Sequence, residues 1–371
     1  MSYSAPSSVL QKLLQRPSAI VALTIITLTS LVAIFAYVLA PDNTPAGNTL
    51  IVELSARPPG FTKQLLYLPA RQVAMPPKAT RWFSGTPAAF KAVPINGYQF
   101  SNNSLVVYHY IDDGLQDTLT YTNKQLLSPG QLTATIAQQQ AAIQQLIRPR
   151  TFYLGTDRYG RDILSRLLIG ARVSLAVGFV AVFLSLTIGI LLGCIAGYYG
   201  GAVDNMVMYL INILWAMPTL LLVFAITLTI GKGFWEIFVA IGLTMWVGAA
   251  RLIRGQVLVL REMEYITAAK ALGLGDMRII FRHILPNIAG PIMVIAASNF
   301  AAAILIEAGL SFLGIGVQPP QPSWGLMIKE HYSFLLTNRL LLALIPGIAI
   351  MLLVYAFNIL GNGLRDALDT R

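Results

Sequence analysis

The sequence predicts an all-α polytopic membrane protein with six transmembrane helices and a mixed α/β extracytoplasmic insertion between the first two. Of its 371 residues, 56% are hydrophobic and only 11% are charged, and the mean hydropathy is +0.65. A soluble domain carries roughly 25% charged residues. Six apolar runs are long enough to cross a hydrocarbon core of about 30 Å as helices. One long stretch, residues 41–150, has no such run and is rich in Pro, Gly, Asn and Gln.

The first apolar run, residues 19–40, is predicted to be the first span, after a polar cytoplasmic N-terminus at 1–18. Lys12 and Arg16 precede the run, and basic residues at the end of a span favour the cytoplasmic side. A cleaved signal peptide has similar flanking charges. Its apolar region is normally about 7–15 residues long, so an uncleaved span is favoured.

The insertion at 41–150 has strand-like runs at 49–54, 65–68, 105–111 and 118–122 and a helical pattern at 131–147. Its basic residues do not contradict an extracytoplasmic place, because long segments translocate largely regardless of charge. His109, Asp112 and Asp113 are residue types that bind metals. Their spacing matches no metal motif, so a solvated strand end is the favoured interpretation.

Residues 151–172 form a lead-in with glycines and alternating charges, which predicts a tight turn and a short amphipathic helix. The remaining core, residues 173–371, contains five further apolar runs at 173–197, 206–230, 234–253, 287–314 and 337–361. With the N-terminus inside, six spans place the loop at 254–286 and the C-terminus in the cytoplasm. From Arg251 to Arg282 there are six basic and three acidic residues, as expected for a cytoplasmic loop.

The net charge of +10 is accounted for by basic residues at the ends of apolar runs, so no nucleic-acid partner is expected. The single cysteine, Cys194, lies in an apolar run and excludes an intrachain disulfide. The sequence contains no phosphate-binding Gly-x-x-x-x-Gly-Lys-Ser/Thr motif and no Gly-x-Ser-x-Gly motif. We therefore expect no enzyme activity, no cofactor and no metal in this chain.

The segment from Glu264 to Pro286 is predicted to be a helix-turn-helix at the membrane surface. Good helix formers, including three alanines, lead up to Gly273, which ends the first helix. Asp276 is expected to cap the second helix, and Pro286 to begin the next one. A buried apolar stripe is expected on the second helix at positions spaced by three and four: Met277, Ile280, Phe281, Ile284 and Leu285.

This segment resembles the cytoplasmic loop of ABC importer permeases, whose signature is Glu-Ala-Ala, three residues, Gly, nine residues, Ile, one residue and Leu-Pro. Thr267 stands where the family often has Glu, and His283 where it has Ile, without changing the spacing. An ordinary basic loop would explain the charges but not this spacing. The resemblance implies a coupling helix that docks on a separate ATPase through Thr267, Ala268, Ala269, Gly273, Leu285 and Pro286.

Two more stretches resemble the dipeptide, oligopeptide and nickel branch of these permeases, and in particular its second permease subunit. They are residues 155–175 and residues 306–325, the latter with Pro-Pro-Gln-Pro-Ser-Trp-Gly. The resemblance implies the ABC type I importer permease fold, in the bacterial inner membrane with both termini cytoplasmic. It implies an importer of peptides or related small solutes. The implied partners are a second homologous permease, two ATPase subunits that bind ATP, an extracytoplasmic solute-binding protein and membrane lipid. The insertion exceeds what the family usually has there.

Two residues are candidates for the translocation path. Glu307 is ionisable within an apolar run, which is costly and marks a functional-site hypothesis; Pro218 should kink its span. The alternative from another class is a proton-coupled secondary transporter that uses Glu307. A third alternative, an enzyme in the insertion anchored by one span, leaves the five other spans unexplained.

Overall fold

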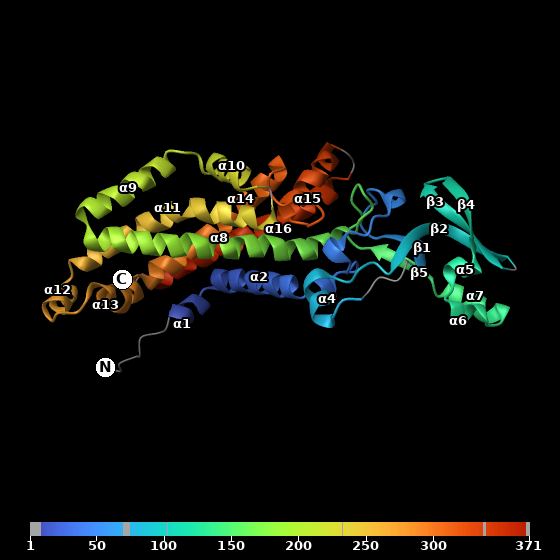
Figure 1. Ribbon diagram of the computed structural model, residues 1–371, viewed down its shortest axis with the longest axis horizontal. Coiled ribbons are helices and arrows are strands. Elements are labelled where there is room, and N and C mark those ends of the chain that lie inside the picture. Colours follow the sequence, from blue (N-terminus) through green and yellow to red (C-terminus); the bar gives the residue numbers. More distant parts are fainter. Residues whose placement is uncertain (1–8, 70–74, 102, 232, 337–338, 369–371) are drawn as a thin grey trace.

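Long helices occupy one end of the elongated protein and an α/β portion occupies the other (Figure 1). The computed structural model describes residues 9–69, 75–101, 103–231, 233–336 and 339–368. Residues 1–8 of the polar N-terminus predicted at 1–18 therefore lie outside the described residues.

Five helices of the described residues are long and apolar enough to cross a membrane. A sixth crossing is available only if the bent pair α9 (Gly201–Trp215) and α10 (Thr219–Ile230) counts as one span; their axes differ by 94°. The run predicted as one span at 206–230 is thus divided into two helices at Pro218, where a kink was predicted. The five long helices are α2 (Pro17–Ile34), α8 (Ile163–Tyr199), α11 (Phe234–Arg261), α14 (Ala289–Leu313), which continues the helical turns from Asp276, and α16 (Leu340–Leu368).

The lead-in does not form a separate amphipathic helix, because α8 is continuous from Ile163 to Tyr199. Asp162 caps its first turn by accepting a hydrogen bond from the Ser165 backbone N–H at 3.3 Å. Gly170 of α8 faces Trp324, and a Cβ there would lie 3.0 Å from the indole ring. No Pro interrupts the helix, so nothing in this stretch separates the lead-in from the span.

A column of glycines brings α8 close to α11. Gly189, Gly193 and Gly197 are spaced by four on one face of α8. A Cβ at Gly193 would lie 2.7 Å from the Ala250 carbonyl oxygen, and one at Gly197 would lie 2.8 Å from Val257 Cβ. Such distances are too short for any side chain. The column thus permits the close helix approach typical of small residues spaced by four.

The insertion contains a five-stranded antiparallel sheet in the order β4-β3-β2-β1-β5. Three short helices cover one face, burying a core that includes Leu66, Leu105 and Ile143 (Figure 1). The strands are β1 (Phe61–Pro69), β2 (Phe90–Ser101), β3 (Ser104–Asp112), β4 (Leu115–Thr122) and β5 (Ile147–Phe152), and the helices are α5 (Asn123–Leu126), α6 (Pro129–Leu132) and α7 (Ile136–Gln144).

The strand runs predicted at 65–68, 105–111 and 118–122 fall in β1, β3 and β4. The run at 49–54 is instead irregular and ends in a 3-10 turn, η2 (Val52–Leu54). The helix expected at 131–147 is shorter, because the chain enters β5 at Ile147. Strand β2 was not predicted, since Pro94 and Gly97 interrupt its pattern; Gly97 lies at a register shift against β3.

The remaining elements connect these two portions or lie at their ends. They are α1 (Val9–Leu14), α3 (Ala36–Leu39), η1 (Pro45–Gly47), α4 (Lys78–Ser84), α15 (Trp324–His331) and η5 (Tyr332–Leu336), together with the turns between α11 and α14.

Candidate functional site

The predicted helix-turn-helix is present at the end of the molecule opposite the insertion (Figure 1). It consists of α12 (Glu264–Ala271) and α13 (Asp276–Ile279), followed by a π-helical turn, η3 (Ile280–Ile284), and a 3-10 turn, η4 (Leu285–Ile288). Pro286 lies in the first turn of η4, where its missing N–H is harmless. The chain then continues directly into α14.

The turn between α12 and α13 depends on Gly273. Its φ of 77° lies in the left-handed region, which costs a residue with a Cβ roughly 1–2 kcal/mol. The Gly273 N–H donates to the Lys270 carbonyl at 2.9 Å, and the Leu274 N–H donates to the Ala269 carbonyl at 3.2 Å. These two bonds define a Schellman motif. A Cβ at Gly273 would meet nothing within 4 Å, so the turn faces open space.

The second helix differs from the prediction in two respects. Gly275, not Asp276, is the N-cap of α13, and the Asp276 carboxylate instead accepts a hydrogen bond from the Tyr198 hydroxyl at 2.7 Å. The expected stripe is only partly buried, because Met277 and Phe281 are 60% and 67% exposed. The wider π-helical turn changes the helical period.

The buried side of this segment is held firmly against α8 and α11. Ile266, Ile279 and Ile284 are fully buried in a cluster with residues of both long helices. The Lys270 ammonium lies 5.0 Å from the Tyr198 ring centroid, and Arg261 Nη1 donates to the Tyr198 carbonyl at 3.2 Å. A displacement of α12 must therefore move the ends of α8 and α11 with it.

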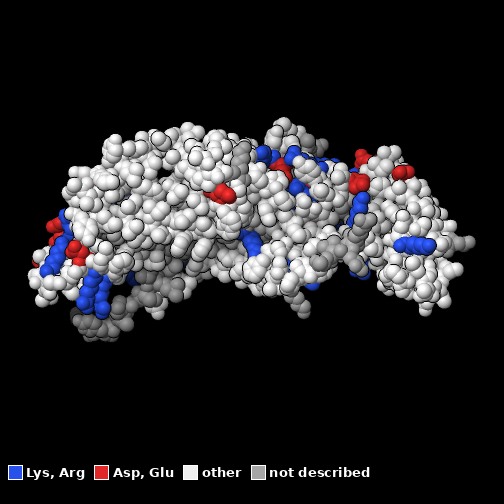
Figure 2. Space-filling model, in the orientation of Figure 1, with Lys and Arg blue, Asp and Glu red and all other residues white. Residues whose placement is uncertain are grey.

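The outward side exposes apolar side chains, two of which were predicted to be buried and one of which was not considered. Leu272 is 82% exposed and lies beside the turn, close in sequence to exposed Met277 and Phe281; we call these three residues the apolar patch. Figure 2 shows charged side chains gathered at the same end, whereas the surface over the long helices is nearly free of them. The nearness of large apolar side chains to a predicted turn was the signal that could have identified them.

The predicted docking residues lie on this segment but are not equally accessible. Thr267, Ala268, Gly273 and Pro286 are exposed and Leu285 is half-buried. Ala269 is only 5% exposed, because it packs in the cluster against α8 and α11.

Pro218 lies at the bend between α9 and α10, where a kink was predicted. A groove of about 310 Å³ opens beside it. The groove lies among α9, α10, α11 and α14. Its lining combines apolar residues with three polar ones, Thr219, Thr244 and Asn299. The Asn299 amide donates to the Ser185 hydroxyl at 3.0 Å, which fixes its orientation.

Glu307 does not line this groove. Its side chain is fully buried within the subunit, and its carboxylate accepts a hydrogen bond from the Ser311 hydroxyl at 2.6 Å. Ser311 also accepts from the Val317 N–H at 3.0 Å, and Ser323, the N-cap of α15, lies 3.5 Å from it. Glu307 thus belongs to a polar cluster that joins the end of α14 to α15.

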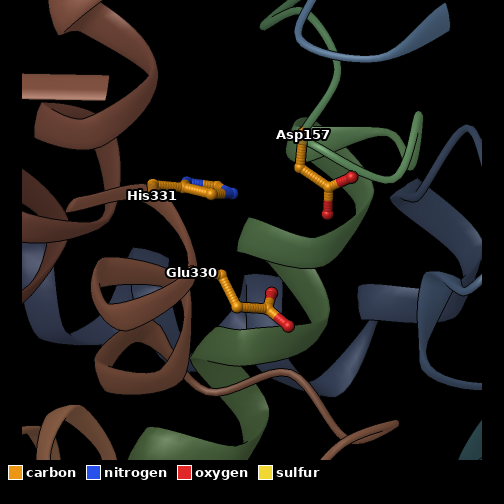
Figure 3. Close-up of side chains that lie close together, drawn as sticks. All are labelled: Asp157, Glu330 and His331. Atoms are coloured by element: carbon orange, nitrogen blue, oxygen red, sulfur yellow. The ribbon is translucent and has the colours of Figure 1, made fainter. Parts of the chain in front are cut away.

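A second buried cluster links the lead-in to α15. Asp157 precedes α8, and Glu330 and His331 end α15; Figure 3 shows their side chains converging. Arg161 Nε donates to Asp157 at 2.6 Å and its Nη2 donates to Glu330 at 2.7 Å. Arg166 Nη2 donates to the same Glu330 oxygen at 3.1 Å.

Asp157, Glu330 and His331 have metal-ligand atoms within 4.8 Å of one another. Their carboxylates are already paired with two guanidinium groups, so the donor set fits an ion-pair network rather than a cation site. Burial opposes the charge of Arg161, but the two carboxylates outweigh it and raise its pKa. Burial lowers the pKa of His331, whose Nδ1 lies 3.0 Å from the Leu342 carbonyl oxygen.

The three residues of the insertion considered as metal ligands, His109, Asp112 and Asp113, do not lie together around one site. Asp112 and Asp113 both accept hydrogen bonds from Arg57, at 2.7 and 2.8 Å, whereas His109 lies 3.4 Å from Glu53. Hydrogen bonds from Tyr110 and Arg57 lower the pKa of Asp113. This arrangement is an ion pair at the end of β3.

Comparisons with known proteins place the long-helix portion among transport proteins. The family described as "Binding-protein-dependent transport system inner membrane component" matches residues 189–371. The glutathione transport system permease protein GsiD of Pectobacterium atrosepticum is 43% identical over 219 residues, which are 59% of this chain and 72% of that protein.

Two further relatives are named for peptides. The dipeptide transport system permease protein DppC of Alkalihalophilus pseudofirmus is 46% identical, and the oligopeptide transport system permease protein OppC of Bacillus subtilis is 41% identical. Each match covers 59% of this chain and 72% of the relative. Among solved structures, an inward-facing methionine ABC transporter, MetNI, gives a TM-score of 0.41 at 21% identity, covering 55% of this chain and 96% of that chain.

Proposed function

Because this chain belongs to the family of binding-protein-dependent transport system inner membrane components, we propose that residues 264–286 receive the movement of a separate ATPase and pass it to the transport helices. The protein is an inner-membrane permease subunit of an ABC transporter, and it works with a partner permease and ATPase subunits.

The apolar patch carries this proposal. Leu272 is exposed beside the turn, Met277 on α13 and Phe281 on η3, and the segment that carries them packs firmly on its other side. Exposed apolar side chains gathered at one place mark interaction sites. Their burial by a partner would stabilise the complex, and the rigid packing on α8 and α11 would carry the movement into the spans.

The groove beside Pro218 is the proposed part of the translocation path in this subunit. A peptide presents amide groups and varied side chains, and the groove offers the Asn299 amide and the Thr244 hydroxyl among apolar residues. The relatives are named for dipeptides, oligopeptides and glutathione, so the proposed substrate class is short peptides. None of these names mentions nickel.

Both described ends of the chain lie on the same side as α12 and α13 (Figure 1). Arg16, just before α2, forms a salt bridge with Asp366 in α16. This arrangement supports a topology with both termini and the coupling segment in the cytoplasm. The insertion is then extracytoplasmic, where an external solute-binding protein would dock beside or upon it. ATP would be bound by the ATPase partner.

The proton-coupled alternative is not favoured. Glu307 is fully buried and hydrogen-bonded to Ser311, so its carboxylate has no contact with the groove or the surface of this subunit. In this position Glu307 is better suited to hold α14 against α15 than to exchange protons with the solute path.

The test is purification of the full chain with its native partners in gentle detergent, followed by mass spectrometry and measurement of ATP hydrolysis. A P-loop ATPase should co-purify with the wild-type chain and be lost from Gly273→Trp, which places a large side chain on the open face of the turn. Gly255→Trp is the matched control, because a Cβ there also meets nothing within 4 Å. Equal ATPase recovery with both variants would refute the docking assignment.

A further inference from the structure

The short helix α4 of the insertion lies beside the end of α2 that is nearer to the insertion (Figure 1). The Trp82 indole N–H donates to the carbonyl of Ile34, the last residue of α2, at 3.0 Å. The Trp82 ring also packs on Phe35, with centroids 5.1 Å apart. Helix α4 is therefore fixed at the level where α2 ends.

A second contact fixes α4 to the neighbouring span. Arg172 of α8 donates from Nη1 to the Phe83 carbonyl at 2.8 Å, and its guanidinium lies 5.1 Å from the Phe83 ring centroid. The chain leaves α4 through Gly85, where a Cβ would lie 2.7 Å from the Asn43 carbonyl oxygen. Side chains on α4 therefore have a defined height relative to both spans.

The outward surface of α4 is apolar although it belongs to a polar insertion. Phe83 is 66% exposed and Trp82 is 37% exposed, next to exposed Val38 and Leu39 of α3. Helix α2 has 18 residues, about 27 Å of helix, so its end lies near the boundary of a hydrocarbon core of about 30 Å. Aromatic side chains are enriched at this boundary because their rings are amphipathic.

The charge of the surrounding sequence is one-sided. From Leu54 to Ile111 there is no Asp or Glu, whereas six residues are Lys or Arg. Arg81 is in α4 itself. Of the other five, Arg57 is paired with Asp112 and Asp113. A basic residue on a helix that also exposes aromatic rings suits the headgroup region of a membrane that contains anionic phospholipid.

We propose that α4 is a membrane-surface anchor, which inserts Phe83 and the edge of Trp82 into the outer leaflet and holds the insertion against phospholipid headgroups. The partner is a lipid surface rather than a protein, because α3, which packs against α4 at the end of a span, exposes large apolar side chains as well. This role goes beyond the proposed transport function and does not depend on the ATPase or the substrate.

The test uses the full chain in vesicles of phosphatidylcholine and phosphatidylglycerol. In a Cys194→Ser background, Phe83→Cys provides one bimane-labelling site on α4. Ile136→Cys is the matched control, since Ile136 is 61% exposed on α7 of the same insertion. Lipids carrying a spin label near the headgroup or near the tail end serve as quenchers, and iodide reports exposure to water.

The expected result is loss of emission at position 83 with headgroup-region spin label, a smaller loss with tail-end label, and protection from iodide. Position 136 should show the opposite pattern. Iodide quenching at 83 equal to that at 136, without lipid quenching, would overturn the proposal. So would protection of position 83 from both quenchers, since a protein surface would then cover α4. Recovery of labelled chain in the vesicle fraction confirms insertion of both variants.

Discussion

Replacement of Leu272 by alanine tests whether the apolar patch is buried by the ATPase. Leu272 is 82% exposed in this subunit, so truncation removes few contacts within the chain and should leave its folding intact. In the assembled transporter the same side chain is expected to be buried. The effect of Leu272→Ala should therefore appear in binding of the ATPase and not in stability of the permease.

The magnitude follows from the area that docking can remove from water. Complete burial of a leucine side chain contributes about 1.5–3 kcal/mol, and with 82% of Leu272 exposed nearly all of this remains available. Alanine retains only a small part of it. A loss of about 2 kcal/mol corresponds to roughly 30-fold weaker binding.

The assay is titration of the purified ATPase onto the permease pair in nanodiscs, with bound ATPase measured by fluorescence. Leu336→Ala is the control, because Leu336 is 90% exposed but lies after α15, away from the coupling segment. The control should bind as the wild type does. Unchanged affinity in Leu272→Ala, with both variants equally well folded, would refute burial of the apolar patch.

Three further predictions concern stability, each measured by thermal unfolding of the purified permease. Gly193→Ala should lower the free energy of unfolding by roughly 1–3 kcal/mol through overpacking, because its Cβ would lie 2.7 Å from the Ala250 carbonyl oxygen. The control Gly255→Ala has open space at its Cβ and should be neutral or stabilising. Equal effects of the two substitutions would contradict close packing of α8 on α11. Glu330→Gln should lower the free energy of unfolding by roughly 3–5 kcal/mol, because the buried guanidinium groups of Arg161 and Arg166 lose their shared carboxylate. A loss below about 1 kcal/mol, the usual value for an exposed ion pair, would show that the cluster is hydrated. Burial lowers the pKa of His331 in the folded state, so below about pH 6.5 the unfolded chain binds more protons than the folded one. The free energy of unfolding should therefore fall as pH drops through about 6.5. His331→Gln should remove this pH dependence in that range.

The coupling segment was predictable where local chemistry decides its structure. Gly273 marks the turn because its positive φ favours glycine, and Pro286 marks the following helical turn. The partner of Asp276 was not predictable, since Tyr198 lies 78 residues away. The exposure of Phe281 was also missed, because a π-helical turn alters the spacing on which the buried stripe was counted.

Elsewhere in the chain too, features set by the local sequence were predictable, whereas contacts between residues distant in sequence were not. The apolar runs predicted where the long helices lie, because the length and hydropathy of a run are properties of the local sequence. The ion pair between Arg161 and Glu330 joins residues 169 apart, so the alternating charges of the lead-in did not predict it. Pro218 was read as a kink, but the angle between α9 and α10 depends on packing that one proline does not specify.

The bend at Pro218 also determines which side of the protein can contact lipid. A continuous helix satisfies its own backbone, but the break between Trp215 and Thr219 interrupts the helical ladder and Pro218 has no N–H to donate. In hydrocarbon each unsatisfied backbone group costs several kcal/mol, so non-helical backbone at membrane depth must face protein or water. The side of α9 and α10 that carries the bend must therefore face the partner permease or a hydrated cavity, which orients the subunit within its complex.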